Sequence, residues 1–103
     1  MRKATVLVDR SVAGTLTEVE KGRRYRFEYR EGYAGEPVSL TMPVRQQVWD
    51  FDCFPPFFEG LLPEGFQLES LLRQMKIDRE DYLSQLLAVG RDMVGAVTVQ
   101  PEE

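Results

Sequence analysis

In the stretch RRYRFEYR, residues 23–30, charged and aromatic side chains alternate with a strict period of two from Arg24 onward. Successive side chains of a β-strand point to opposite faces, so Tyr25, Phe27 and Tyr29 share one face and the charged residues share the other. We interpret the aromatic face as the buried face of a sheet and the charged face as its solvent face.

An RNA-binding strand is the alternative for KGRRYRFEY, residues 21–29. That signature has an aromatic residue where Arg23 stands and a small residue where Arg24 stands, so the buried face is favoured. The chain is also acidic, because residues 51–103 carry four Lys/Arg against ten Asp/Glu. Counterion release from a phosphate backbone would not favour its binding. We therefore expect no direct nucleic-acid partner, and a basic surface on another protein is the better candidate.

Four further segments have the composition of strands. They are residues 3–8 (KATVLV), 12–19 (VAGTLTEV), 38–42 (VSLTM) and 94–100 (VGAVTVQ). The first two predict a hairpin, because Asp9-Arg10-Ser11 supplies turn chemistry between them. The last would have to return to the sheet, and Gly95 would there allow a close backbone approach.

Three groups of apolar residues have helical spacing. They are Phe57, Phe58, Leu61 and Leu62; Leu68, Leu71, Leu72 and Met75; and Tyr82, Leu83, Leu86 and Leu87. The first helix is expected to start near Pro55 or Pro56 and to stop at Pro63. For the third, Asp78 is the expected N-cap, and Gly90 is the expected left-handed residue after the last turn.

These elements predict a single α+β domain over residues 1–103: a small antiparallel, barrel-like sheet of about five strands with about three helices packed on it. With 43% hydrophobic residues, 103 residues are enough for one core and too few for two. No stretch approaches a membrane span or a signal-peptide core. A single cysteine, Cys53, favours a reducing, cytoplasmic location.

Residue types that serve catalysis or cofactor binding are missing from the sequence. There is no His, so Ser-His and Cys-His pairs and the usual zinc spacings cannot be assembled. The eight glycines form neither a Walker loop nor GxGxxG. Asp50 and Asp52 lack the further ligands that a hard cation needs, and we interpret them as solvated acids at a strand end. We expect no enzyme activity, no cofactor and no metal.

Three segments resemble a known family. FFEGLLPEG at 57–65 and LLAVGRDMVGAVTVQPE at 86–102 resemble the N-terminal subdomain of HipA-type toxin kinases, which carries an FF-x-x-LLP segment and a later G-R-D-x-V-G-A-V strand entry. PVSLTMP at 37–43 is similar to the S-L-x-x-P stretch that precedes them in the family. The three segments follow the family's order and span nearly the whole chain.

The resemblance implies a function that works through a partner. Fused kinases continue into a much larger core, whereas these residues hold no ATP loop and no catalytic-loop or metal-binding Asp. The chain is similar to the free-standing HipS form of HipBST toxin–antitoxin systems. This similarity implies an antitoxin that binds and inhibits a HipA-like (HipT) serine/threonine kinase, in a complex that also holds a HipB-like DNA-binding protein. Docking on the small lobe of the kinase would disfavour the lobe closure that phosphoryl transfer requires.

Three large aromatic residues are the candidate anchors for such a partner: Trp49, Phe51 and Phe54. Central aromatic side chains are the usual hot spots of an interface, and Trp is the most enriched type. The alternative is that all three belong to the core, as we expect for the Phe and Leu residues of 57–62.

Two polar segments are further candidates for the interface. Pro63, Glu64 and Gly65 follow the first predicted helix and would lie near a rim that a kinase covers. Arg91 and Asp92 either form a polar turn between helix and strand, which we favour, or contact the partner directly.

Two rival functions remain. The chain would act as an accessory or stabilising N-terminal domain of a full-length HipA-type kinase, without inhibiting it, or as a binding module unrelated to kinases. The inhibitory role is what the resemblance to the split HipBST systems implies.

Overall fold

A computed structural model describes residues 1–90 and 95–102 and contains five strands and three helices in this part of the chain. In chain order they are β1 (Arg2–Val8), β2 (Ser11–Glu20), β3 (Arg24–Tyr29), β4 (Val48–Phe51), α1 (Pro56–Glu59), α2 (Gly65–Met75), α3 (Tyr82–Val89) and β5 (Val97–Pro101). The predicted α+β class is confirmed, and no helix in the described ranges is long and apolar enough to cross a membrane.

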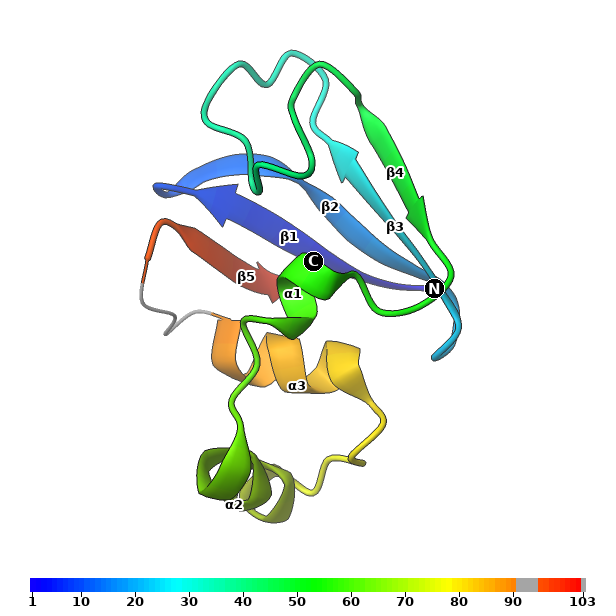
Figure 1. The fold of residues 1–103 in the computed structure, drawn as a ribbon, viewed down its shortest axis with the longest axis vertical. Helices are drawn as coiled ribbons and strands as arrows, with labels where there is room; N and C mark the ends of the chain where they lie inside the picture. Colours follow the sequence, from blue (N-terminus) through cyan, green and yellow to red (C-terminus); the bar gives the residue numbers. More distant parts are fainter. Residues whose placement is uncertain (91–94, 103) are drawn as a thin grey trace.

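All five strands form one antiparallel sheet in the order β4-β3-β2-β1-β5 (Figure 1). β1 and β2 are the predicted hairpin, and β5 returns to pair with β1. The sheet is open, with β4 and β5 at its two edges, so the expected barrel-like closure is wrong. Because β4 has only four residues, it forms a short edge at one side of the sheet.

The inner face of the sheet is the one predicted from residues 23–30. Tyr25, Phe27 and Tyr29 are buried, while the charged residues between them are exposed. In the register of the sheet Phe27 lies opposite Leu16 on β2 and opposite Trp49 on β4. One row of apolar side chains therefore runs across the strands, and α1 and α3 supply Phe58, Leu83 and Leu86 to the core.

The fourth strand predicted at residues 38–42 is wrong, because this segment forms a tight turn closed by a bridge between Ser39 and Met42. Its two ends are buried, and the Tyr29 hydroxyl holds both by accepting from the Val38 N–H at 3.0 Å and donating to the Met42 carbonyl. Leu40, at the middle of the turn, is 93% exposed. The strand that completes the sheet is instead β4.

The helices begin close to the predicted positions, with two corrections at their ends. α1 starts at Pro56 as expected but ends at Glu59, and hydrogen-bonded turns continue to Leu62. The N-cap of α3 is Asp81 and not Asp78, because the Ser84 N–H donates to Asp81 Oδ1 at 3.2 Å. The Asp78 carbonyl instead accepts from the Asp81 N–H.

The sequence predicts a left-handed conformation at Gly90 and a close backbone approach at Gly95, and the structure shows the reverse. Gly90 has an ordinary φ of −61°, and a Cβ there would clash with the Val99 carbonyl. Gly95 has a φ of +116° and open space around it. The close approach therefore lies at Gly90, where α3 ends against β5, and the positive φ lies at Gly95.

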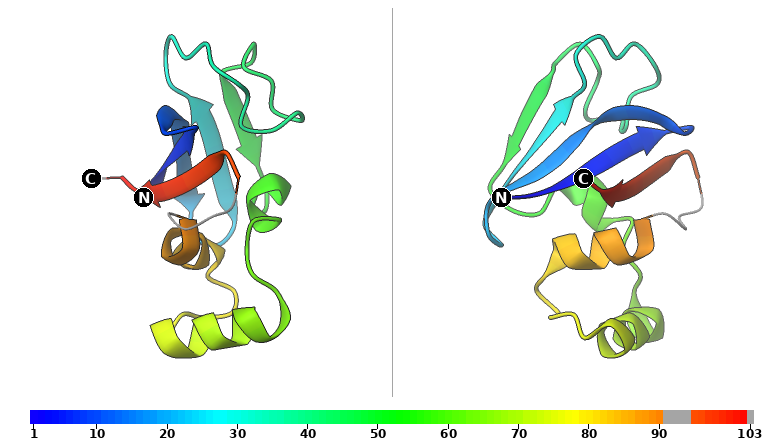
Figure 2. Two further views of the ribbon diagram at one scale, coloured as in Figure 1. Left: turned by 90° about the vertical axis from the view of Figure 1, so that its left-hand side faces the viewer. Right: turned by 180° about the vertical axis from the view of Figure 1, so that it is seen from behind.

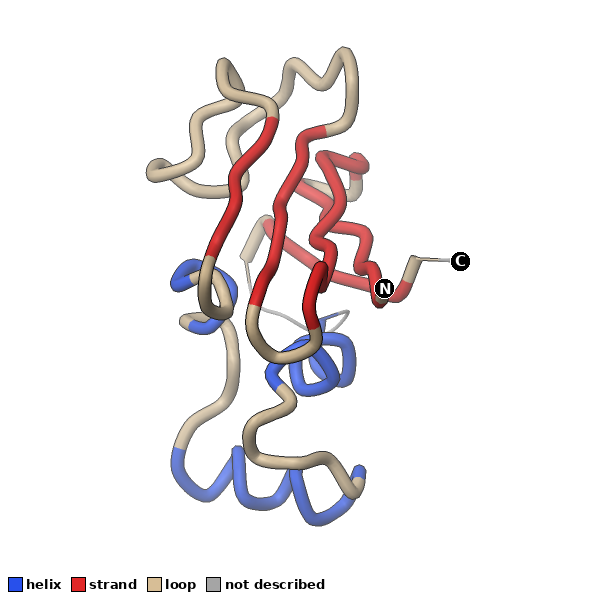
Figure 3. The backbone as a smooth tube through the Cα atoms, turned by 90° about the vertical axis from the view of Figure 1, so that its right-hand side faces the viewer, coloured by secondary structure: helices blue, strands red, loops and turns tan. Residues whose placement is uncertain are grey.

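The molecule is elongated, with principal extents of 40 × 28 × 26 Å. The helices gather at one end and the long loop between β3 and β4 lies at the other (Figure 3). α3 lies next to the sheet, whereas α2 lies beyond it at the tip, as three views agree (Figures 1 and 2). α2 is therefore the element farthest from the core.

Candidate partner-binding surface

The three candidate aromatic anchors fall into different environments. Phe54 is 4% exposed, and its ring meets Tyr25 edge-to-face at a centroid distance of 5.1 Å, so the core alternative holds for it. Trp49 and Phe51 on β4 are half-buried against the core. The Trp49 Nε1–H donates to the Gln46 carbonyl at 3.2 Å, which fixes the indole at the edge of the sheet. An anchoring role for Trp49 and Phe51 stays a prediction.

The candidate interface residues 63–65 lie where the link between α1 and α2 ends and α2 begins. Pro63 is half-buried, and Glu64 and Gly65 are exposed. Glu64 is the N-cap residue of α2, yet its side chain accepts no capping hydrogen bond. Its carboxylate is therefore available to another group. Arg91 and Asp92 lie outside the described residues, so both interpretations of them stay open.

α2 exposes an aromatic residue that the sequence reasoning missed. No residue of α2 is buried, and Phe66 is 94% exposed. Together with Pro63, Leu71 and Val89 it lines a shallow, mainly apolar groove at this end of the molecule. The sequence does contain a signal, because at 100° per residue Phe66 points away from the face formed by Leu68, Leu71, Leu72 and Met75.

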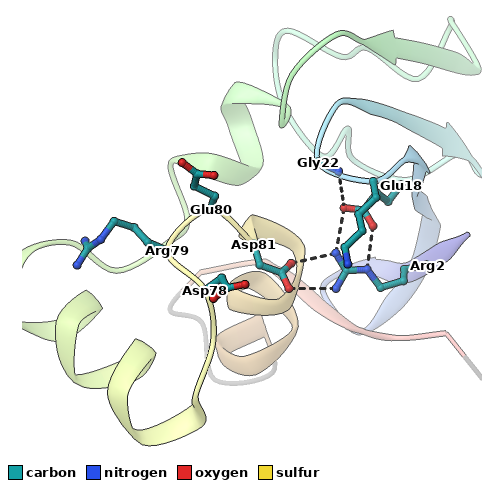
Figure 4. Close-up of a pocket in the computed structure, with 8 residues that line it drawn as sticks. Arg2, Glu18, Gly22, Asp78, Arg79, Glu80 and Asp81 are labelled. Carbon is teal, nitrogen blue, oxygen red and sulfur yellow. Dashed lines mark hydrogen bonds and ion pairs between the residues drawn. The ribbon is translucent and has the colours of Figure 1, made fainter.

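A charged network joins α3 to the sheet, as Figure 4 shows. The Arg2 guanidinium donates to both carboxylate oxygens of Glu18, at 2.8 and 3.0 Å. It also donates to Asp81 Oδ1 at 2.9 Å and to Ser84 Oγ at 2.8 Å. Glu18 further accepts from the Gly22 N–H at 3.2 Å. One side chain on β1 thus binds β2 and the first turn of α3 together.

The pKa shifts within this network show that its charges stabilise one another. Burial alone would raise the pKa of Glu18, but hydrogen bonds from Arg2, Gly22 and Tyr25 outweigh it and the pKa is lowered. The same balance, with Arg2 and Ser84 as donors, lowers the pKa of Asp81. Burial and the neighbouring Glu18 raise the pKa of Tyr25 to about 12. Hydrogen bonds to both carboxylates raise the pKa of Arg2.

The network positions the helical end of the molecule. α2 contacts α3 but is not among the elements that contact the sheet closely, so its position depends on α3. α3 in turn is fixed at its start by Arg2 and at its end by the close approach of Gly90 to β5. Sequence reasoning missed this arrangement because Asp81 is 79 positions from Arg2 and no local pattern links them.

The architecture defines a small α+β domain that exposes the aromatic ring of Phe66 on its helical end, and comparison with known proteins gives its family. The sequence model of the HipA N-terminal domain matches residues 4–100. The chain belongs to the HipA N-terminal domain family. The matched region is not itself a catalytic kinase domain.

Relatives of two lengths share this domain. An uncharacterized protein of Haemophilus influenzae is 33% identical over 103 residues, which is all of this chain and 95% of that protein. Putative kinases Y4dM and Y4mE of Sinorhizobium fredii are 34% and 27% identical over the whole chain, which spans only 28% and 25% of their length.

A solved structure agrees with this assignment. The N-terminal domain of HipA toxin superimposes with a TM-score of 0.78 at 30% identity, covering all of this chain and 94% of that one. The chain therefore has the same fold as that domain.

Proposed function

We propose that this chain is a non-catalytic antitoxin that binds and inhibits a HipA-like (HipT) serine/threonine kinase, within a complex that also holds a HipB-like DNA-binding protein. The observation that carries the proposal is that this domain occurs both in a protein of nearly its own length and as one part of longer putative kinases. It makes up nearly the whole Haemophilus influenzae relative, and about a quarter of each putative kinase. A domain that serves a kinase within one chain has a surface that fits a kinase when the two are separate chains.

The helical end is the surface that best fits this role. Phe66 lies in water on an element that contributes nothing to the core, and large aromatic residues are the usual hot spots of protein interfaces. Pro63 and Glu64 adjoin it, which agrees with their proposed place at the rim. Wedged against the small lobe, this end would hinder the lobe closure over ATP that aligns the transferred phosphoryl group.

A second candidate is an accessory domain that stabilises a kinase without inhibiting it. The two Sinorhizobium fredii relatives favour it, because in both the domain is part of a putative kinase. The two functions share one interface and differ in what binding does to activity.

Titration of the chain into a purified HipA-like kinase from the same organism separates these functions. Activity should fall in step with complex formation, and unchanged activity at saturation would leave the accessory role. In the same assay Phe66→Ala should weaken binding roughly 10- to 30-fold, the range of an aromatic hot spot. Leu40→Ala is the matched control, because Leu40 is equally exposed and lies in the loop at the opposite end of the molecule.

A further inference from the structure

A second groove is lined by residues of all three helices and of the link between α1 and α2. Its apolar part is formed by Leu62, Pro63, Leu68 and the ring of Tyr82. The two grooves share Pro63, so this one continues the surface proposed above to bind the kinase. An occupant of the second groove would therefore belong to the same partner.

Two carboxylates border this groove, Glu59 at the end of α1 and Glu64 before α2. Both are exposed, and neither forms an ion pair with any residue of the described ranges. By contrast Glu69 on α2 is already paired with Arg79 at 2.6 Å. No Lys or Arg is among the groove's lining residues, so its electrostatic potential favours a cation from elsewhere.

A buried amide side chain also lines this groove. Gln85 is 1% exposed and lines it. Its Nε2 donates to the carbonyls of Asp78 at 3.2 Å and Arg79 at 2.9 Å, which turns the amide nitrogen away toward that loop. Among the described residues no buried side-chain nitrogen or oxygen lacks a hydrogen-bond partner, so Gln85 itself requires no donor from a ligand. The preference of the groove for a cationic occupant therefore rests on its two unpaired carboxylates.

We propose that the groove binds an arginine side chain of the kinase partner. The aliphatic stem would lie on Leu62 and Leu68, and the planar guanidinium would stack on the Tyr82 ring. Its five N–H groups form a planar fork that can serve two carboxylates together, which the three donors of a lysine point charge match less well. The identity of the partner rests on the proposed function, whereas the recognition of arginine rests on the groove alone.

The groove can be tested without the kinase. The ¹⁵N-labelled chain is titrated with acetyl-Gly-Arg-Gly-amide and, as the neutral isostere, with acetyl-Gly-citrulline-Gly-amide. We expect saturable shifts of the Glu64 and Tyr82 amides and of the Gln85 side-chain amide with the arginine peptide only. Glu59→Gln/Glu64→Gln should weaken this binding at least tenfold, whereas Glu31→Gln/Glu36→Gln, with the same charge change in the distant exposed loop, should not. Equal shifts with both peptides, or equal affinity in both double variants, overturn the proposal.

Kinase binding and the oligomeric state complete the test. Glu59→Gln/Glu64→Gln should weaken the complex with the kinase by about tenfold or more, with a reduced dependence on salt. Unchanged kinase affinity would overturn the kinase as the source of the arginine. If the chain forms a dimer without the kinase, and this double variant is a monomer, the arginine comes from a second copy of the chain and the kinase is again overturned as its source. If the chain binds arginine but inhibits no kinase, the groove stands and the proposed function fails.

Discussion

Arg2→Met should remove the side chain that links α3 to the sheet, and should therefore lower the free energy of unfolding. Methionine keeps the aliphatic stem but removes the guanidinium that contacts Glu18, Asp81 and Ser84. Glu18 is only 5% exposed, so its carboxylate would remain buried without its main partner. The variant therefore tests whether the network stabilises the fold or merely occupies its surface.

The expected magnitude follows from the burial of the two partners. Removing one member of a fully buried ion pair costs about 3–5 kcal/mol. Here the Arg2 side chain is 38% exposed, and Glu18 keeps its bonds from Gly22 and Tyr25, so we expect a smaller loss of about 2 kcal/mol. For a domain of this size that lowers Tm by about 8–16 °C.

The loss of stability caused by Arg2→Met should also depend on pH, and the pKa shifts give its direction. The folded pKa values of Glu18 and Asp81 are lowered, so their stabilisation is present above the unfolded value near about 4 and is lost as the pH falls through the folded value. The difference between wild type and Arg2→Met should therefore be large at pH 7 and shrink below about pH 4.

Urea unfolding followed by circular dichroism and by the fluorescence of Trp49 measures both effects. Arg26→Met is the matched control, because Arg26 pairs with Asp50 at 2.7 Å on the exposed face of the sheet. That variant should leave the unfolding midpoint unchanged. The reasoning is refuted if Arg2→Met destabilises no more than Arg26→Met, or if its deficit is the same at acidic and neutral pH.

Three more predictions concern packing and use the same unfolding assay. Phe54→Ala should cost about 3–5 kcal/mol because its buried ring leaves a cavity, whereas Phe66→Ala should leave the midpoint within error; equal effects would contradict the assignment of core and surface. Tyr29→Phe should cost about 1–3 kcal/mol because the turn at 38–42 loses its hydroxyl clamp, and a neutral result would show that the turn does not need it. Gly90→Ala should cost about 1–3 kcal/mol because its Cβ meets the Val99 carbonyl, and Gly60→Ala, with ordinary contacts, should be nearly neutral.

The sheet could be predicted from the sequence where the signal is local. Residues 24–29 alternate with a period of two, and that period alone fixes which side chains face the core. Residues 38–42 have the composition of a strand but bury their first and last residues, Val38 and Met42, around a hydroxyl supplied by Tyr29. Composition cannot reveal a partner that lies nine or more positions away.

The same limit explains the errors at the helix ends. Asp78 and Asp81 are both good N-cap residues, and what distinguishes Asp81 is Arg2, which reaches it from the first strand. Gly90 and Gly95 both look like backbone requirements, but only the docking of α3 on β5 decides which one meets a carbonyl. Local chemistry thus proposes the candidate residues, and tertiary contacts choose among them.

The core residues and the residues of the proposed binding surface are separate in this domain. The sheet face, Phe54 and Phe58 form the core, whereas α2 contains no buried residue and the carboxylates of Glu59 and Glu64 have no partner within the described ranges. Changes at the helical end should therefore alter partner affinity while the free domain unfolds at the same denaturant concentration. If Glu59→Gln/Glu64→Gln shifts that midpoint as much as it weakens binding, the groove serves the fold and not a partner.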